Sequence, residues 1–323
     1  MRVRFWGVRG SLPVPGPATE RYGGNTSCVE VVTLAGTRII VDAGTGIRLL
    51  GKEMMAEGAN GNGAAAGSGA GFAAGSGAAH ILISHTHWDH IQGLPFFSPL
   101  YRKGNRLTVY GRQHDDVPMR AVLPAQSGSP YFPAPADGER ATVTFRDLPD
   151  DARFEIEDAK VSSTRLNHPY VATAYGIVAD GAKVVYVSDT APFTDILFDR
   201  QFVPGPPPAG SVLPETSRAL LKAMRANVVR LCEGADLVIY DTMFTPEDYQ
   251  SFPHYGHSRP RDALEIARAA GAKTLALYHH APERADAEVD SMLAKTRAEV
   301  AQTGGGIEVV AAFEGLDLML GRL

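Results

Sequence analysis

The stretch Ile81–His90, ILISHTHWDH, decides the fold that this sequence predicts. It opens with an apolar, β-branched run that is typical of a buried strand. Its last six residues contain four side chains that can bind a metal ion, namely His85, His87, Asp89 and His90. Open α/β sheets place their sites just beyond the carboxyl ends of strands. The stretch therefore predicts a strand that leads directly into a metal site.

Four further apolar runs also end on an acidic residue or a histidine, which packing alone does not explain. They are Ile39–Val41 before Asp42, Val184–Ser188 before Asp189, Leu237–Tyr240 before Asp241 and Leu275–Tyr278 before His279. Imidazole and carboxylate ligands without thiolate suit Zn²⁺, Mn²⁺ or Fe²⁺ and leave coordination positions open. The pattern indicates a metal-dependent hydrolase.

Composition narrows the class of protein. A chain of 323 residues with 44% hydrophobic residues can bury one large core or two. Its formal charge of −5 argues against a chain-wide electrostatic contact with nucleic acid. Two cysteines are too few for a disulfide framework. The first residues lack the apolar core of a signal peptide, and no apolar run is long enough to cross a membrane, so we expect a cytoplasmic protein.

The order of the predicted elements suggests one domain over residues 1–323, with strands at both ends and two stacked sheets flanked by helices. Two segments stand apart. Gly58–Gly77 contains only Gly, Ala, Ser and Asn besides Phe72, which predicts a flexible surface insertion that buries almost nothing. Pro204–Pro214 holds five prolines and is expected to form neither helix nor central strand.

Several motifs resemble the metallo-β-lactamase superfamily, in its ribonuclease Z-like branch, which also contains cyclic-phosphate and cyclic-nucleotide phosphodiesterases. They are Phe5–Ser11, Gly23–Ser27, Val41–Gly46 and His85–His90. The resemblance covers nearly the whole chain. It implies an α/β fold, the αββα sandwich of two mixed sheets with helices on the outer faces. It also implies homodimers and a dinuclear metal site at one sheet edge.

The resemblance implies seven metal ligands for two divalent ions, Zn²⁺ first, with Mn²⁺ or Fe²⁺ as alternatives. They are His85, His87, Asp89, His90, His168, Asp189 and His279. Asp189 matches the bridging carboxylate. In the family pattern the last ligand stands three residues before a proline; Pro282 makes this His279 and leaves His280 as a neighbour that lines the pocket. We expect Asp42 to support a ligand or the glycine-rich turn beside it.

The resemblance also implies catalytic residues, for which we name Asp89, Asp241 and His257. In the family an acid orients a histidine beside the scissile phosphate, and Asp241 stands where ribonuclease Z usually has Glu, a departure closer to the cyclic phosphodiesterases. Arg9, Ser11 and His280 are the expected substrate-binding residues. Arg9 and Ser11 equally suit contact with a phosphate or closure of a turn.

The leading prediction is a phosphodiesterase that cleaves a small cyclic phosphodiester, a cyclic nucleotide or cyclic sugar phosphate, by a metal-bridging hydroxide. One rival is a transfer-RNA 3′-end endonuclease, which would need a basic RNA-binding arm, whereas Gly58–Gly77 carries no Lys or Arg. Another is a lactonase or ester hydrolase, since one fold hosts several chemistries. Neither nucleic acid nor a membrane is an expected partner.

Overall fold

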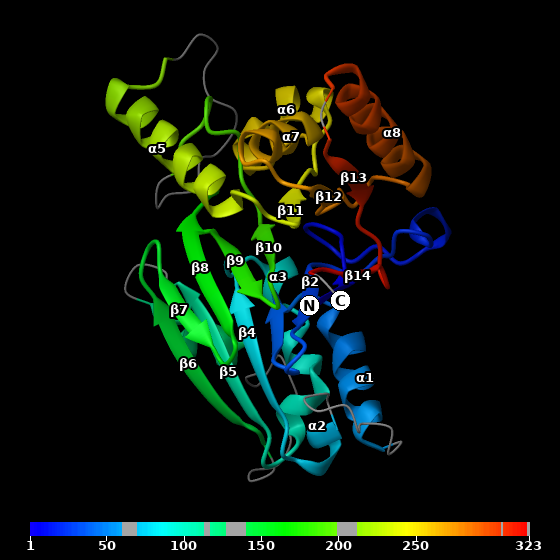
Figure 1. The fold of residues 1–323 in the computed structure, drawn as a ribbon. Helices are drawn as coiled ribbons and strands as arrows, with labels where there is room; N and C mark the ends of the chain where they lie inside the picture. The colour runs from blue at the N-terminus through cyan, green and yellow to red at the C-terminus, as the bar shows by residue number, and fades with distance from the viewer. Residues whose placement is uncertain (60–69, 113–116, 127–139, 199–211, 305, 322–323) are drawn as a thin grey trace.

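Two seven-stranded sheets lie face to face in the computed structural model of this chain (Figure 1). The structure describes residues 1–59, 70–112, 117–126, 140–198, 212–304 and 306–321. The first sheet has the order β14 (Asp317–Met319), β1 (Arg2–Gly7), β2 (Cys28–Val32), β3 (Arg38–Val41), β4 (Ala78–Ile83), β5 (Arg106–Arg112) and β6 (Thr142–Leu148). The second has the order β13 (Glu308–Ala311), β12 (Thr274–Tyr278), β11 (Leu237–Asp241), β10 (Ala182–Val187), β9 (Thr173–Ala179), β8 (Ala159–Arg165) and β7 (Arg153–Ile156).

Both sheets are mixed. Strands β3 to β6 run parallel to one another, as do β10 to β13, while β14, β1 and β2 and the β7–β8–β9 strands pair antiparallel. The central parallel strands β3, β4, β10, β11 and β12 are largely apolar and buried because both of their faces are covered. Their carboxyl ends meet at one edge of the sandwich, where the predicted ligands lie.

Side-chain alternation along the strands builds three apolar layers. In β10, Val184 and Tyr186 point into the space between the sheets, while Val185 and Val187 point outward beneath helices. The same period of two places Ile39 of β3 between the sheets and Ile40 on the outer face. One core thus joins the two sheets, and one further layer covers each outer face.

Helices cover the outer faces of the described part of the chain (Figure 1). Apolar side chains of α1, α2 and α4 pack on the first sheet, and those of α5 and α7 pack on the second. The helices are α1 (Ile47–Ala59), α2 (Ala70–Ala74), α3 (Trp88–Ile91), α4 (Met119–Ala125), α5 (Glu215–Cys232), α6 (Pro246–Ser251), α7 (Pro260–Ala269) and α8 (Asp286–Gln302), with 3₁₀ turns at Pro17–Thr19, Leu94–Phe96, Ser98–Tyr101 and Pro253–Tyr255. The predicted αββα sandwich is confirmed. None of the helices in the described ranges combines the length and apolar composition needed to span a membrane.

The prediction for Gly58–Gly77 was wrong at its carboxyl end. Residues 70–74 form α2, and Phe72 is buried among Leu107 and other apolar side chains of the first sheet's outer layer. The Asn105 amide donates to the Phe72 carbonyl, and its side-chain oxygen accepts from the Gly77 N–H. The Phe72 ring and the Asn105 side chain therefore hold residues 70–77 against the first sheet. Residues 60–69, and most of the proline-rich segment at 204–211, lie outside the described residues.

Candidate metal centre

The predicted ligands converge because each follows a strand that ends at the same edge of the sandwich. His85 lies two residues beyond β4, Asp189 two residues beyond β10 and His279 directly after β12. His279 has a left-handed backbone, with φ of 62°, which turns its ring into the site. Gly10 lets the amino-terminal loop close over that ring, since a Cβ atom there would lie 2.5 Å from a ring atom of His279. All seven predicted ligands are brought together.

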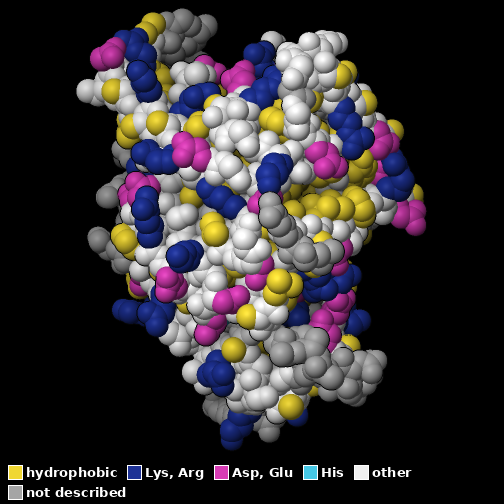
Figure 2. Space-filling view, viewed as in Figure 1, with side chains coloured by type: hydrophobic (Ala, Val, Ile, Leu, Met, Phe, Trp, Pro, Cys, Tyr) yellow, Lys and Arg dark blue, Asp and Glu magenta, His cyan; other side chains and the backbone are white. Residues whose placement is uncertain are grey.

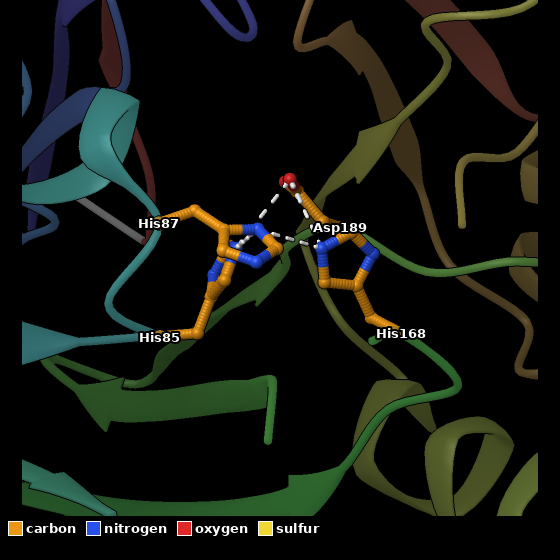
Figure 3. A group of neighbouring side chains, drawn as sticks. All are labelled: His85, His87, His168 and Asp189. Atoms are coloured by element: carbon orange, nitrogen blue, oxygen red, sulfur yellow. Dashed lines mark hydrogen bonds and ion pairs between the residues drawn. The ribbon is translucent and has the colours of Figure 1, made fainter. Parts of the chain in front are cut away.

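One group of donor atoms consists of three imidazoles and Asp189 (Figure 3). Nδ1 of His87 lies 3.0 Å from Nε2 of His85 and 3.1 Å from Nε2 of His168. Oδ2 of Asp189 lies 3.6 Å from Nε2 of His85 and 3.8 Å from Nε2 of His168. Burial holds the pKa of His85 and His168 well below the usual histidine value, which keeps both rings neutral. We call these four residues the first group.

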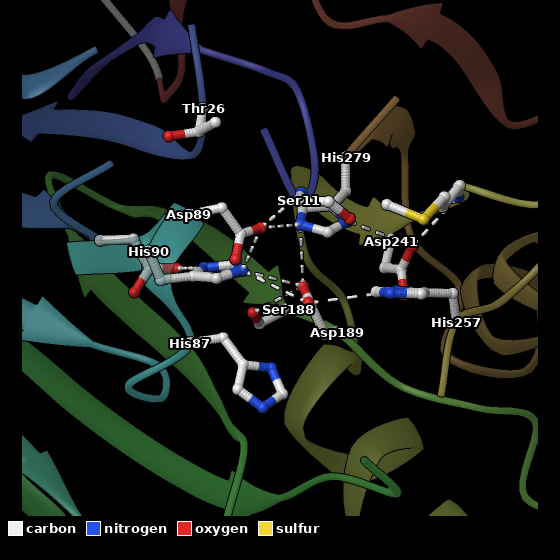
Figure 4. Close-up of polar contacts among 12 residues, drawn as sticks. Ser11, Thr26, His87, Asp89, His90, Ser188, Asp189, Asp241, His257 and His279 are labelled. Atoms are coloured by element: carbon white, nitrogen blue, oxygen red, sulfur yellow. Dashed lines mark hydrogen bonds and ion pairs between the residues drawn. The ribbon is translucent and has the colours of Figure 1, made fainter. Parts of the chain in front are cut away.

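A second group shares Asp189 with the first (Figure 4). Nε2 of His279 lies 3.1 Å from Oδ2 of Asp89 and 3.2 Å from Oδ1 of Asp189. Nε2 of His90 lies 3.2 Å from Asp89 and 3.3 Å from Asp189. Burial alone would lower the pKa of His90, but the neighbouring carboxylates raise it well above its usual value. We call Asp89, His90, Asp189 and His279 the second group.

The donor set fits two divalent cations. Within each group, the four donor atoms lie within 4.8 Å of one another. In the first group two Nε2 atoms point at a single Nδ1 atom, which can accept only one hydrogen bond, so a shared cation satisfies all three better than protons do. The ligands are imidazole and carboxylate throughout, as expected for a hydrolytic rather than a structural site.

Hydrogen bonds behind the ligands fix their orientation. The Asp42 carboxylate lies 2.7 Å from Nδ1 of His90 and accepts from the Ser84 N–H, the Ser84 hydroxyl and the Tyr186 hydroxyl, at 2.7 to 2.8 Å. Nδ1 of His168 lies 2.9 Å from the Gly256 carbonyl oxygen, so this nitrogen carries the proton. The expected supporting role of Asp42 is confirmed. Ser84 and Tyr186 were missed because a serine and a tyrosine inside apolar strands resemble ordinary core residues.

Asp241 and His257 form a pair beside the shared carboxylate. Nδ1 of His257 lies 3.0 Å from Oδ2 of Asp241 and 4.0 Å from Oδ2 of Asp189. The N–H groups of Thr190 and Met243 donate to the Asp241 carboxylate. Burial would lower the pKa of His257, but Asp241 raises it above the usual value. Donor atoms of this pair also lie within 4.8 Å of those of Asp189 and His279, so geometry alone permits a ligand role for them.

The chain after His257 leads into α7, which starts at Pro260 with Arg259 as the N-cap residue. The Ser258 hydroxyl donates to the Thr190 carbonyl at 2.6 Å. His257 thus sits in a loop tied to the strand end that carries Asp189.

Of the three expected substrate-binding residues, Arg9 takes its alternative role in a turn and His280 faces away from the site. Arg9 is fully buried, and its guanidinium donates to the carbonyls of Gly23, Ala281 and Arg284, so it closes the amino-terminal turn. His280 is also buried and turns away from the site: its Nε2 lies 2.8 Å from the Ala312 carbonyl oxygen. Burial lowers the pKa of His280 to about 3.

Ser11, the third of these residues, does lie at the site. Its backbone N–H donates to Oδ2 of Asp89 at 2.8 Å, and its side chain is exposed to solvent (Figure 4). Contact between its hydroxyl and a substrate stays a prediction.

The chain resembles known proteins in sequence and in fold. Residues 37–201 match the family model of the β-lactamase superfamily domain. A ribonuclease Z from Geobacillus kaustophilus is 28% identical over 227 residues, 62% of this chain and 69% of that protein. The metallo-β-lactamase fold protein YhfI from Bacillus subtilis has a TM-score of 0.62 at 18% identity over 98% of both chains. Unliganded yeast PDE1 has a TM-score of 0.61 at 16% identity over 99% of both. The two structural matches share the fold.

Proposed function

Because this chain belongs to the metallo-β-lactamase superfamily, we propose that it is a dinuclear metal-dependent phosphodiesterase acting on a small cyclic phosphodiester. The observation that carries the proposal is the Asp241–His257 pair beside the carboxylate shared by two groups of metal ligands. An imidazole beside a carboxylate can donate to the phosphoryl and leaving oxygens of a phosphodiester, on which negative charge develops during cleavage.

The first and second groups would hold one divalent ion each, with Zn²⁺ as the proposed metal. When bound, the ions supply an attacking water of lowered pKa and neutralise charge on the phosphoryl group. Asp189 keeps the two groups at a fixed separation, since its carboxylate contacts members of both. The network around Asp42 and the Gly256 carbonyl holds the imidazole rings in the orientation that ligation requires.

His257 would donate a proton to the leaving alkoxide. Its Nδ1 is held by Asp241, and Nε2 makes no hydrogen bond to any described residue, so this second nitrogen is available to the substrate. The raised pKa means that a larger fraction of His257 is protonated near neutral pH than for an ordinary histidine. Asp241 has its own oxygens held by backbone N–H groups and acts by orienting and charging this ring.

Processing of transfer RNA is the second candidate, because the curated relative from Geobacillus kaustophilus is a ribonuclease Z. Recognition of a polynucleotide backbone depends on clustered Lys and Arg side chains. The net charge is −5, and basic and acidic side chains are interspersed over the face drawn in Figure 2. These features favour a small substrate over RNA.

The test is turnover of the metal-loaded protein on a substrate panel. It contains cyclic mononucleotides, cyclic dinucleotides, bis(p-nitrophenyl) phosphate, a lactone and precursor transfer RNA. We expect the largest kcat/KM on a cyclic mononucleotide or another small cyclic diester. Preferred cleavage of precursor transfer RNA at the 3′ end would establish the second candidate, and preferred hydrolysis of the lactone would overturn both.

A further inference from the structure

The metal centre opens to solvent beside His87. Six of the seven predicted ligands are buried, and His87 alone is half-buried. His87 is therefore the predicted ligand with the greatest exposure to solvent, and a substrate that enters here lies against its imidazole. Side chains around His87 are in a position to contact the part of the substrate that projects from the site.

Tyr170 lies beside this opening. Its ring stands nearly perpendicular to the His87 ring, at 88° and 6.1 Å between centroids, and the residue is 40% exposed. Its backbone is left-handed, with φ of 64°, a conformation that costs a non-glycine residue energy. Such strain persists where the surroundings impose it and is concentrated at functional sites. The strained backbone holds a large ring at the entrance instead of in the core.

Trp88 directly follows His87 in the sequence and supplies a second exposed aromatic side chain. It is the first residue of α3 and is 70% exposed, the second most exposed large hydrophobic side chain in the described part of the chain. Trp6, in contrast, is buried. Within two positions of each of the seven predicted ligands the sequence contains no Lys or Arg. The residues that flank the ligands in the sequence therefore include aromatic side chains but no basic ones.

We propose that Tyr170 and Trp88 form an aromatic platform on which the nucleobase of a substrate stacks. The inference deepens the proposed function, on which it rests, because it selects a cyclic mononucleotide over a cyclic sugar phosphate. A nucleobase offers each ring a planar partner, and stacking tolerates any base because each has a π-face. A cyclic sugar phosphate offers C–H groups to such a ring but no planar π-face, so we expect it to gain less from the platform.

The kinetic test compares substrates with and without a base. The variants are Tyr170→Ala, Tyr170→Phe and Trp88→Ala, with Leu34→Ala as the control, since Leu34 is 65% exposed in the turn between β2 and β3. For cyclic adenosine monophosphate we expect KM to rise about tenfold in both alanine variants while kcat stays within about twofold. Tyr170→Phe should restore KM, and cyclic glycerol phosphate should show no change. Equal losses on both substrates, or none on either, would overturn the platform.

Tryptophan fluorescence separates the platform from the proposed function. Adenosine monophosphate should quench the exposed Trp88 of the metal-loaded protein in a saturable manner, while ribose 5-phosphate should not. Trp88→Phe, which leaves only buried Trp6, should abolish the quenching. If quenching occurs but no cyclic nucleotide is hydrolysed, the proposed function is wrong and the platform stands. If cyclic nucleotides are hydrolysed without quenching and without a KM effect, the platform is wrong and the function stands.

Discussion

The first and second groups share Asp189 but differ in what holds them in place. In the first group, three imidazole nitrogens approach one another at 3.0 to 3.1 Å, and one of the rings is half-buried. In the second group, imidazoles face carboxylates, and Asp42 and the Ser11 N–H support them from behind. The difference teaches that the second group is preorganised by opposite charges and hydrogen bonds. The first group has fewer such supports, with the Gly256 carbonyl behind His168, and its crowded imidazole nitrogens depend more on a cation.

We expect the largest effect from replacing the residue that both groups share. Asp189→Ala should lower bound metal from about two ions per chain to less than one and abolish turnover, because each group loses its common carboxylate. Elemental analysis of loaded, desalted protein measures the metal. Asp317→Ala, on exposed β14, should keep both ions. Full metal content in Asp189→Ala would show that the two groups are independent.

Variants of the adjacent residues His279 and His280 test whether the second group can lose its ion while the first group keeps its own. His279→Ala should lose one ion and nearly all turnover, since Nε2 of His279 contacts both Asp89 and Asp189. His280→Ala should keep both ions and lose only thermal stability, because this ring bonds a backbone carbonyl.

His280→Gln, whose amide can still donate to that carbonyl, should recover part of the stability of His280→Ala. The opposite pattern, with metal lost from the His280 variants and retained in His279→Ala, would reverse the assignment.

His257→Ala asks whether this histidine belongs to either group. We expect both ions to remain while turnover falls on the order of 10²- to 10⁴-fold, the scale of a general acid or charge-stabilising donor. The loss should shrink with p-nitrophenolate, a leaving group that needs little protonation. Asp241→Asn should lose less than His257→Ala.

Loss of an ion from His257→Ala would place His257 among the ligands instead. If turnover fell equally for substrates with good and with poor leaving groups, His257 would bind the phosphate without transferring a proton.

The smallest expected effect is on metal affinity, and it tests whether the residue behind one group of ligands also supports the other. Asp42→Asn should weaken binding of one ion about 10- to 100-fold, the usual cost of changing a residue that orients a ligand, and leave the other ion unaffected. Competition with a chelator of known affinity measures both constants. If the affinity for both ions fell equally, the support from Asp42 would extend through Asp189 to the first group.

The sequence predicted the ligands well because a His or Asp that directly follows a buried strand rarely serves packing alone. It left the role of Arg9 open and misplaced His280 because residue type does not reveal which way a side chain turns. The left-handed backbone at His279 sends one ring into the site and the next toward Ala312. The burial of Phe72 was missed because the composition of a segment averages over its residues and hides a single buried ring.

Because the ligands are spread along the chain, the two groups are completed at different times during synthesis. The last member of the first group to leave the ribosome is Asp189, whereas the second group waits for His279. At ordinary bacterial and eukaryotic rates this interval lasts roughly 5 to 20 seconds. Strand β12, which ends directly before His279, pairs with β11 in the second sheet, so this part of the sheet is also missing until then. A nascent chain therefore exposes four of the five histidines among the predicted ligands to cellular metal before the centre can close around a pair of ions.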